Sequence, residues 1–185
     1  DLWGLMGPDG QWAVPPQFQA IGDPGMGRFP VKKDGKWGAV DLTGQVVTPF
    51  EFEAIGTIAT VTPMQWQGQW WAIGPDGQPS DVPLPFQDLV GNDGTCMVGL
   101  ENGHPIAVDR GDDPSVVRID GIDKMSPPSE GYVAFRAGDL AGHLDCVFGN
   151  MIGGQPFWEE TRAMREGLAA VKSPEGWGYV AQYSN

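Results

Sequence analysis

Basic side chains are scarce in this chain of 185 residues. Eleven Lys and Arg stand against 24 Asp and Glu, which gives a formal net charge of −13. A surface of this sign repels nucleic acid and anionic lipid, so both classes of partner are disfavoured. The same surface attracts a cationic protein at low salt, although a need for solubility accounts for the charge equally well.

Long apolar runs are also missing. No stretch approaches the roughly 18 apolar residues that span a bilayer, and no basic-then-apolar leader precedes Asp1. Because the first residue is not Met, we expect that upstream residues were removed. The sequence leaves the compartment open.

Cysteine and histidine are rare. Cys96 and Cys146 are too few for a disulfide framework and form no C-x-x-C motif, so we predict two buried, small apolar side chains. A single disulfide between them stays open. His104 and His143 have no third nitrogen or thiolate ligand at a metal-like spacing, so no zinc site is predicted.

Signatures of catalysis are missing as well. The glycine-containing segments 22–27 and 149–154 are followed by no Gly-Lys-Ser/Thr, so we interpret them as turns rather than phosphate loops. The aspartates at 109–123 do not have the regular spacing of a calcium loop. The sequence predicts no catalytic residue, no metal and no cofactor, and hence a protein that is not an enzyme.

Turn-forming residues, in contrast, are abundant. The chain holds 28 Gly and 17 Pro, yet 41% of its residues are hydrophobic and eight are Trp. This apolar content separates it from disordered chains of similar glycine and proline content. The composition predicts a strand-rich globule with many turns.

One strand–turn–strand unit recurs along the whole sequence. In residues 31–41 two strands flank an Asp-Gly turn, and each recurring turn is followed by a strand with alternating apolar residues. Aligned on the turn glycine, the copies are Asp34-Gly35, Gln67-Gly68, Asn102-Gly103, Ala141-Gly142 and Glu175-Gly176. Each His follows one of these glycines, so we predict both to be turn-flanking surface residues.

The rest of the unit is also repeated. A second strand ends near proline, an aromatic-x-x-aliphatic piece follows, and a glycine-led strand closes the unit. The aromatic pieces are Phe18-Gln19-Ala20-Ile21, Phe52-Glu53-Ala54-Ile55 and Phe86-Gln87-Asp88-Leu89.

Three motifs, Lys36-Trp37-Gly38-Ala39-Val40-Asp41, Val47-Thr48-Pro49 and Gly167-Leu168-Ala169-Ala170-Val171-Lys172, resemble the WG-repeat (KWG-type) family of bacterial proteins. The resemblance covers essentially the entire chain, although the third copy has Trp70-Trp71 and the next two lose the tryptophan. It implies a β-repeat scaffold without a transferable catalytic centre.

The expected fold is all-β, in one domain over residues 1–185. We place repeats at 1–35, 36–68, 69–103, 104–142 and 143–176, with a terminal strand at 177–185. One three-stranded repeat cannot bury both of its faces, so neighbours must stack or the array must close. Strands left over at the two ends would complete a fifth blade, which favours a propeller-like ring of about five blades closed by the termini. An open β-solenoid is the alternative.

Tryptophans and aspartates are the candidate binding residues. Trp3, Trp37, Trp70 and Trp177 occupy one repeated position, so we assign them to the scaffold. Tryptophans off that position and the aspartates of the longest repeat are candidate partner contacts. They are Trp12, Trp66, Trp71, Trp158, Asp109, Asp112, Asp113, Asp120 and Asp123.

We therefore expect a non-catalytic protein-binding module whose acidic surface binds a basic or amphipathic protein, such as a bacterial effector or toxin. A glycan or cell-wall binding module that uses the off-consensus tryptophans is the alternative. The oligomeric state is left open.

Overall fold

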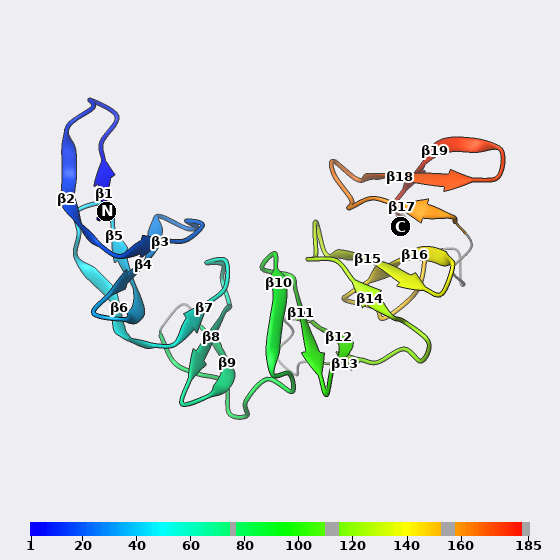
Figure 1. Ribbon diagram of the computed structural model, residues 1–185, viewed down its shortest axis with the longest axis horizontal. Helices are drawn as coiled ribbons and strands as arrows, with labels where there is room; N and C mark the ends of the chain where they lie inside the picture. Colours follow the sequence, from blue (N-terminus) through cyan, green and yellow to red (C-terminus); the bar gives the residue numbers. More distant parts are fainter. Residues whose placement is uncertain (75–76, 110–114, 153–157, 183–185) are drawn as a thin grey trace. The chain divides into compact units, whose positions relative to one another are not determined.

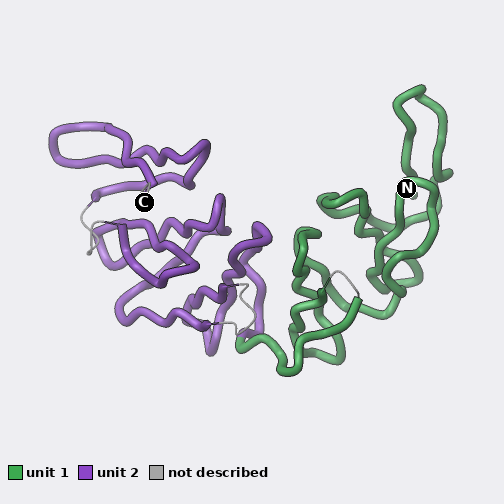
Figure 2. Tube along the Cα trace, turned by 180° about the vertical axis from the view of Figure 1, so that it is seen from behind, with its two compact units in different colours: residues 1–85 green, residues 86–185 purple. Residues whose placement is uncertain are grey.

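The computed structural model describes residues 1–74, 77–109, 115–152 and 158–182. These residues form 19 strands in six antiparallel sheets and no α-helix, which confirms the all-β prediction. The described part of the chain accordingly has no helix that could span a membrane. The chain divides into two compact units, residues 1–85 and 86–185, which Figure 2 colours separately.

The first unit holds three sheets. Their strand orders are β1-β2, β3-β4-β5-β6 and β7-β8-β9 (Figure 1). The strands are β1 (Trp3–Met6), β2 (Trp12–Phe18), β3 (Ala20–Ile21), β4 (Arg28–Lys33), β5 (Lys36–Asp41), β6 (Val46–Phe52), β7 (Ala54–Ile55), β8 (Thr62–Trp66) and β9 (Gln69–Ile73).

The second unit also holds three sheets, with the strand orders β10-β11-β12-β13, β14-β15-β16 and β17-β18-β19. The strands are β10 (Asp88–Asn92), β11 (Cys96–Glu101), β12 (His104–Asp109), β13 (Val116–Val117), β14 (Lys124–Met125), β15 (Tyr132–Ala137), β16 (Leu140–Asp145), β17 (Glu160–Thr161), β18 (Leu168–Ser173) and β19 (Gly176–Ala181).

A tight hairpin organises each repeat. Lys33 pairs with Lys36 across the turn between β4 and β5, and the β8–β9 and β11–β12 hairpins have the same register. Both turn residues have positive φ in these three hairpins, as at Asp34 (50°) and Gly35 (81°). Two-residue turns of this kind match the twist of the paired strands and favour Asn, Asp and Gly. The Asp-Gly signal in the sequence is therefore confirmed as a hairpin turn.

The fourth hairpin corrects the sequence alignment. The alignment placed its turn glycine at Gly142, whereas Ala137 pairs with Leu140 and the turn glycine is Gly138. By this register Gly142 occupies the position of Gly38, the second residue of the Trp-Gly pair. Two glycines four residues apart both fit a strand–turn–strand pattern, so the alignment followed the wrong one.

Each unit buries its own apolar side chains. In the first unit Leu5, Val14 and Phe18 of the β1–β2 sheet pack with Val31 and Val40 of the next sheet. These contacts show how a small sheet buries a face that it cannot bury alone.

The largest apolar cluster of the second unit contains a disulfide. Cys96 and Cys146 are fully buried and bonded to each other across 50 residues, with a Cα–Cα distance of 5.9 Å. The expectation of two separate, small apolar side chains is therefore wrong. Cys96 begins β11 and Cys146 directly follows β16, so the disulfide joins two neighbouring sheets.

Candidate functional site

The repeated Trp position differs in exposure from sheet to sheet. Trp70 is 6% exposed and Trp37 is half-buried, which fits a scaffold role. Trp3 and Trp177 are 58% and 50% exposed. The guanidinium of Arg162 lies 5.1 Å from the ring centroid of Trp177, a cation–π contact on one face of the indole.

The off-consensus tryptophans fall into two groups. Trp12 on β2 and Trp66 on β8 are exposed at 52% and 39%. Trp71 is half-buried, and its indole N–H is the one buried side-chain donor or acceptor of the described residues that has no hydrogen-bond partner. Trp158 is only 6% exposed, so its indole presents little surface to a partner.

Trp158 is a core residue of the repeat. Its backbone bridges to Ala141, as Phe52 pairs with Trp37 at the same step of the second repeat. The position is apolar and buried in every copy, with Phe18, Phe52, Phe86, Ile122 and Trp158. The repeat spacing that links Phe18, Phe52 and Phe86 continues to residues 122 and 158, and following it would have revealed this role in the sequence.

Asp123 supports a turn. Its carboxylate accepts a hydrogen bond from the backbone N–H of Gly138 at 2.6 Å. The side chain of Gln19 accepts from Gly35 N in the same way, at 2.8 Å. Asp123 therefore holds a repeated scaffold position, which the first repeat fills with the uncharged acceptor Gln19.

Asp109 also has a local role. It accepts a hydrogen bond from the Ser115 hydroxyl at 2.5 Å, and it ends β12 where Asp41 ends β5. Asp41 accepts from the hydroxyl and the backbone N–H of Thr43, and the hydroxyl above all lowers the pKa of its carboxyl. Acceptors of this kind fix the start of a turn.

The remaining predicted aspartates are Asp112, Asp113 and Asp120. Asp112 and Asp113 lie outside the described residues. Asp120 is exposed. The described candidates divide between the two units, with Trp12, Trp66 and Trp71 in the first, and Asp109, Asp120, Asp123 and Trp158 in the second.

Carboxylates also join neighbouring repeats in the second unit. The side chain of Asp93 accepts from Gly131 N at 2.7 Å. Glu130, next to that glycine, accepts from Glu166 N at 2.5 Å and from Gly167 N at 2.8 Å. Part of the acidic excess is therefore used by the scaffold, a role that composition alone does not reveal.

The two histidines have different environments. His104 is exposed, as expected for a residue beside a turn. His143 is fully buried, because the corrected register places it inside β16. Its Nε2–H donates to the Arg162 carbonyl oxygen at 2.7 Å, and burial lowers the pKa of the imidazole. A neutral, hydrogen-bonded imidazole packed 5.9 Å from the Trp158 ring is a core element.

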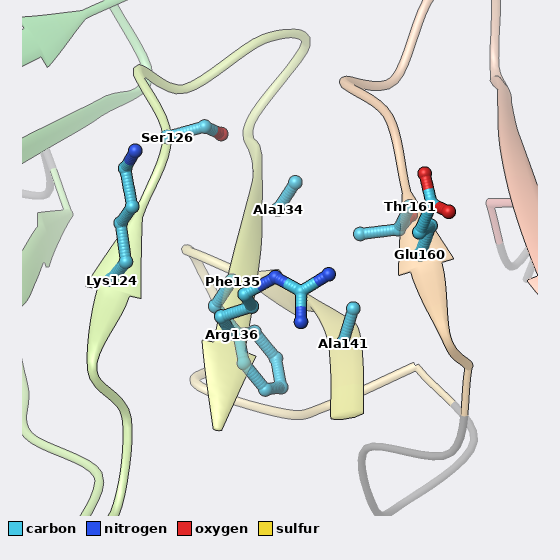
Figure 3. Close-up of a pocket in the computed structure, with 8 residues that line it drawn as sticks. All are labelled: Lys124, Ser126, Ala134, Phe135, Arg136, Ala141, Glu160 and Thr161. Atoms are coloured by element: carbon cyan, nitrogen blue, oxygen red, sulfur yellow. The ribbon is translucent and has the colours of Figure 1, made fainter. Parts of the chain in front are cut away.

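A shallow cavity lies between the β14–β16 sheet and β17 (Figure 3). Its volume is about 210 Å³, below the size usual for small-molecule sites. Arg136 and Glu160 line it, and Glu160 also contacts Lys172 at 3.2 Å. Thr161 also lines the cavity, and its hydroxyl oxygen lies 3.1 Å from His143 Nε2. The described residues contain no cluster of three metal-ligating side chains.

Comparison with family models identifies the repeats at the amino end. Residues 3–37 and 37–59 match the model described as WG containing repeat. The match confirms the WG-repeat resemblance where the Trp-Gly motif is best preserved. No curated protein matches the sequence.

Solved structures show a similar fold at low identity. Hsv2 of Kluyveromyces lactis is 10% identical, with a TM-score of 0.54 over 93% of this chain and 63% of that one. A eukaryotic initiation factor is 14% identical, with a TM-score of 0.53 over 96% of this chain and 58% of that one. The chain thus spans less than two thirds of the length of either protein. The similarity shows the fold alone: the chain is all-β with several small sheets, and its structural neighbours are β-propeller-like proteins.

Proposed function

We propose that the chain, which carries WG-containing repeats over residues 3–59, is a non-catalytic module that binds a basic or amphipathic protein. The observation that carries this proposal is the exposure of Trp12 and Trp66 on strands of a regular scaffold. Other repeats have Val46 at the place of Trp12 and Lys33 at the place of Trp66, so the scaffold itself requires neither indole. Exposed tryptophans are enriched where proteins bind one another.

Charge supports the same class of partner. A net charge of −13 accelerates encounter with a cationic protein and slows it with an anionic one. Asp120, Asp112 and Asp113 belong to the proposed acidic surface. Asp109, Asp123 and Trp158 are left out of it because the scaffold uses them.

Two further parts of the proposal concern architecture and compartment. About five blades closing into a ring through the termini is the proposed arrangement, with an open β-solenoid as the alternative. Small-angle X-ray scattering distinguishes the two, because a ring and an open stack of equal mass differ in radius of gyration. The Cys96–Cys146 disulfide favours a compartment that keeps thiols oxidised.

The test is an affinity capture at low and high salt, with bound proteins identified by mass spectrometry. We expect a basic protein that binds the wild type, is released by salt, and is lost from a Trp12→Ser, Trp66→Ser double variant. Val46→Ser, at the exposed equivalent of position 12, is the matched control and should keep the partner. Retention by the double variant, or binding only to glycan or peptidoglycan beads, would contradict the proposal.

A further inference from the structure

The β15–β16 hairpin lacks the tryptophan of the repeated position. Ala141 lies opposite Arg136 in this hairpin, as Trp37 lies opposite Lys32 in the β4–β5 hairpin. Ala141 therefore stands where the second repeat has its scaffold indole. A methyl group in place of an indole leaves space unless the neighbouring side chains move into it.

Two other sheets show where this indole lies. A Cβ on Gly22, which directly follows β3, would lie 3.8 Å from the Cζ3 atom of Trp37. Arg162 directly follows β17, and its guanidinium lies 5.1 Å from the ring centroid of Trp177. Ser126 follows β14 in the same way, and all three residues donate their backbone N–H to the next strand at the same step. Because Ser126 lines the cavity of Figure 3, this cavity occupies the space of the indole.

The opposite wall of the cavity corresponds as well. Trp37 and Ile55 pack against one buried cluster, and Ile55 is the second residue of β7. Thr161 is the second residue of β17 and lines the cavity, together with the buried side chains of Phe135 and Ala141. The volume of about 210 Å³ is enough for one aromatic ring, since a cavity of about 150 Å³ can bind benzene. The cavity is therefore a space that the repeat elsewhere fills with its own aromatic side chain.

Two cations line this cavity in an acidic chain. Lys124 and Arg136 lie opposite each other on β14 and β15, and like charges at such a step destabilise an antiparallel pair. Neither of them forms an ion pair within the described residues, whereas Glu160 contacts Lys172. An anion beside both cations would offset their repulsion. The equivalent pairs of the other sheets, none with two cations, are Ala20–Lys32, Ala54–Gln65, Asp88–Leu100 and Glu160–Lys172.

The position of Arg136 suits a ligand with a flat ring. One guanidinium nitrogen donates to the Glu159 carbonyl oxygen at 3.2 Å. The guanidinium lies beside Ala141 (Figure 3). A planar guanidinium stacks on an aromatic ring and also binds carboxylates, and Arg162 over Trp177 is an example of the stacking in this chain. Arg136 can therefore contact both an aromatic ring and a carboxylate of the same ligand.

We propose that this cavity is a binding site for a small aromatic carboxylate. The ring takes the place of the missing indole against Phe135 and Ala141, and the carboxylate binds Lys124 and Arg136. All of these residues belong to the second unit. The exposed tryptophans of the protein-binding proposal lie in the first unit, so either proposal can fail without the other.

The test titrates the disulfide-bonded full chain with three ligands and follows the NMR chemical shifts of its backbone amides. Indole-3-acetate has the ring and the charge, indole-3-acetamide has the ring alone, and acetate has the charge alone. We expect indole-3-acetate to shift amides of β14, β15 and β17 with a dissociation constant of about 1 mM or below. The amide should bind about two- to fivefold more weakly, and acetate should not saturate in this range. No saturation by about 10 mM indole-3-acetate, or equal affinity for the amide, would overturn the proposal.

Two variants and a control make the test specific. Ala141→Trp restores the scaffold tryptophan, so it should weaken indole-3-acetate by about tenfold or more without lowering the urea midpoint. Lys124→Gln, at an exposed position, should weaken indole-3-acetate about two- to fivefold and leave indole-3-acetamide unchanged. Lys33→Gln, which removes an exposed charge from the first unit, should bind like the wild type.

The two variants are independent of each other. If Ala141→Trp does not fold by circular dichroism, the comparison of Lys124→Gln with Lys33→Gln decides. Wild-type affinity in a folded Ala141→Trp variant would show that the ligand binds elsewhere and would overturn the proposal. Equal losses for Lys124→Gln and Lys33→Gln would overturn it too, because they would reflect only the net charge.

Discussion

Reduction of the Cys96–Cys146 disulfide should destabilise the second unit strongly. The bond closes a segment of 50 residues, and opening it returns conformational entropy to the unfolded chain. For a loop of this length the chain-entropy model gives a loss of about 4 kcal/mol in the free energy of unfolding. Both cysteines lie in one apolar cluster with Val98, Val133 and Leu144, so the loss falls on the core of this unit.

Urea unfolding followed by circular dichroism measures this loss on the oxidised and the reduced chain. A Cys96→Ala, Cys146→Ala double variant is the control, because a reductant should not shift its midpoint. Two free thiols in the unfolded, unreduced protein would refute the bond. A loss below about 1 kcal/mol on reduction would refute the argument from loop closure.

Three substitutions, two of them with a matched control, test the packing and the titration that the structure assigns. Burial lowers the pKa of His143, so the imidazole stays neutral in the folded state at a pH where it is protonated in the unfolded chain. The free energy of unfolding should therefore be at its full value above about pH 6.5 and fall by up to about 1.4 kcal/mol per pH unit below that pH. His143→Gln should remove this slope in urea titrations, whereas His104→Gln, at the exposed histidine, should keep it. By the same assay, Trp158→Ala should lower the free energy of unfolding by about 3–5 kcal/mol, and Trp12→Ala by less than about 0.5 kcal/mol. Similar losses for the two variants would contradict the burial assigned to these side chains. Gly38→Ala should cost about 1–3 kcal/mol, because its Cβ would lie 2.7 Å from a backbone oxygen, and an unchanged midpoint would show that the strands separate freely.

The hairpins could be predicted from the sequence because their signals are local. Asp34-Gly35 between two alternating strands specifies both the turn and the register, and the structure has both. The same local logic failed at Gly142, where two glycines compete and only the pairing of β15 with β16 decides between them.

Roles that depend on distant partners could not be predicted in this way. Cys96 meets Cys146 only after two sheets pack together, so their bond follows from tertiary structure. Asp123 looks like one more member of an acidic loop until its hydrogen bond to Gly138 is seen. Trp158 was within reach, because its repeat spacing places it with buried aromatic residues, whereas the exposure of Trp12 and Trp66 had to come from the structure.

The carboxylate bridges between turns give the second unit a direction from one repeat to the next. Glu130 serves the turn at Glu166 and Gly167, and Asp93 serves the turn at Gly131, always toward the later repeat. In the second unit, these repeats therefore offer side-chain acceptors toward the next repeat and backbone donors toward the preceding one. Duplication or exchange of whole repeats would keep these hydrogen bonds between turns. A shift of one residue within a turn would break the hydrogen bonds to both neighbouring repeats. Repeat number and turn sequence are thus expected to evolve under very different constraints.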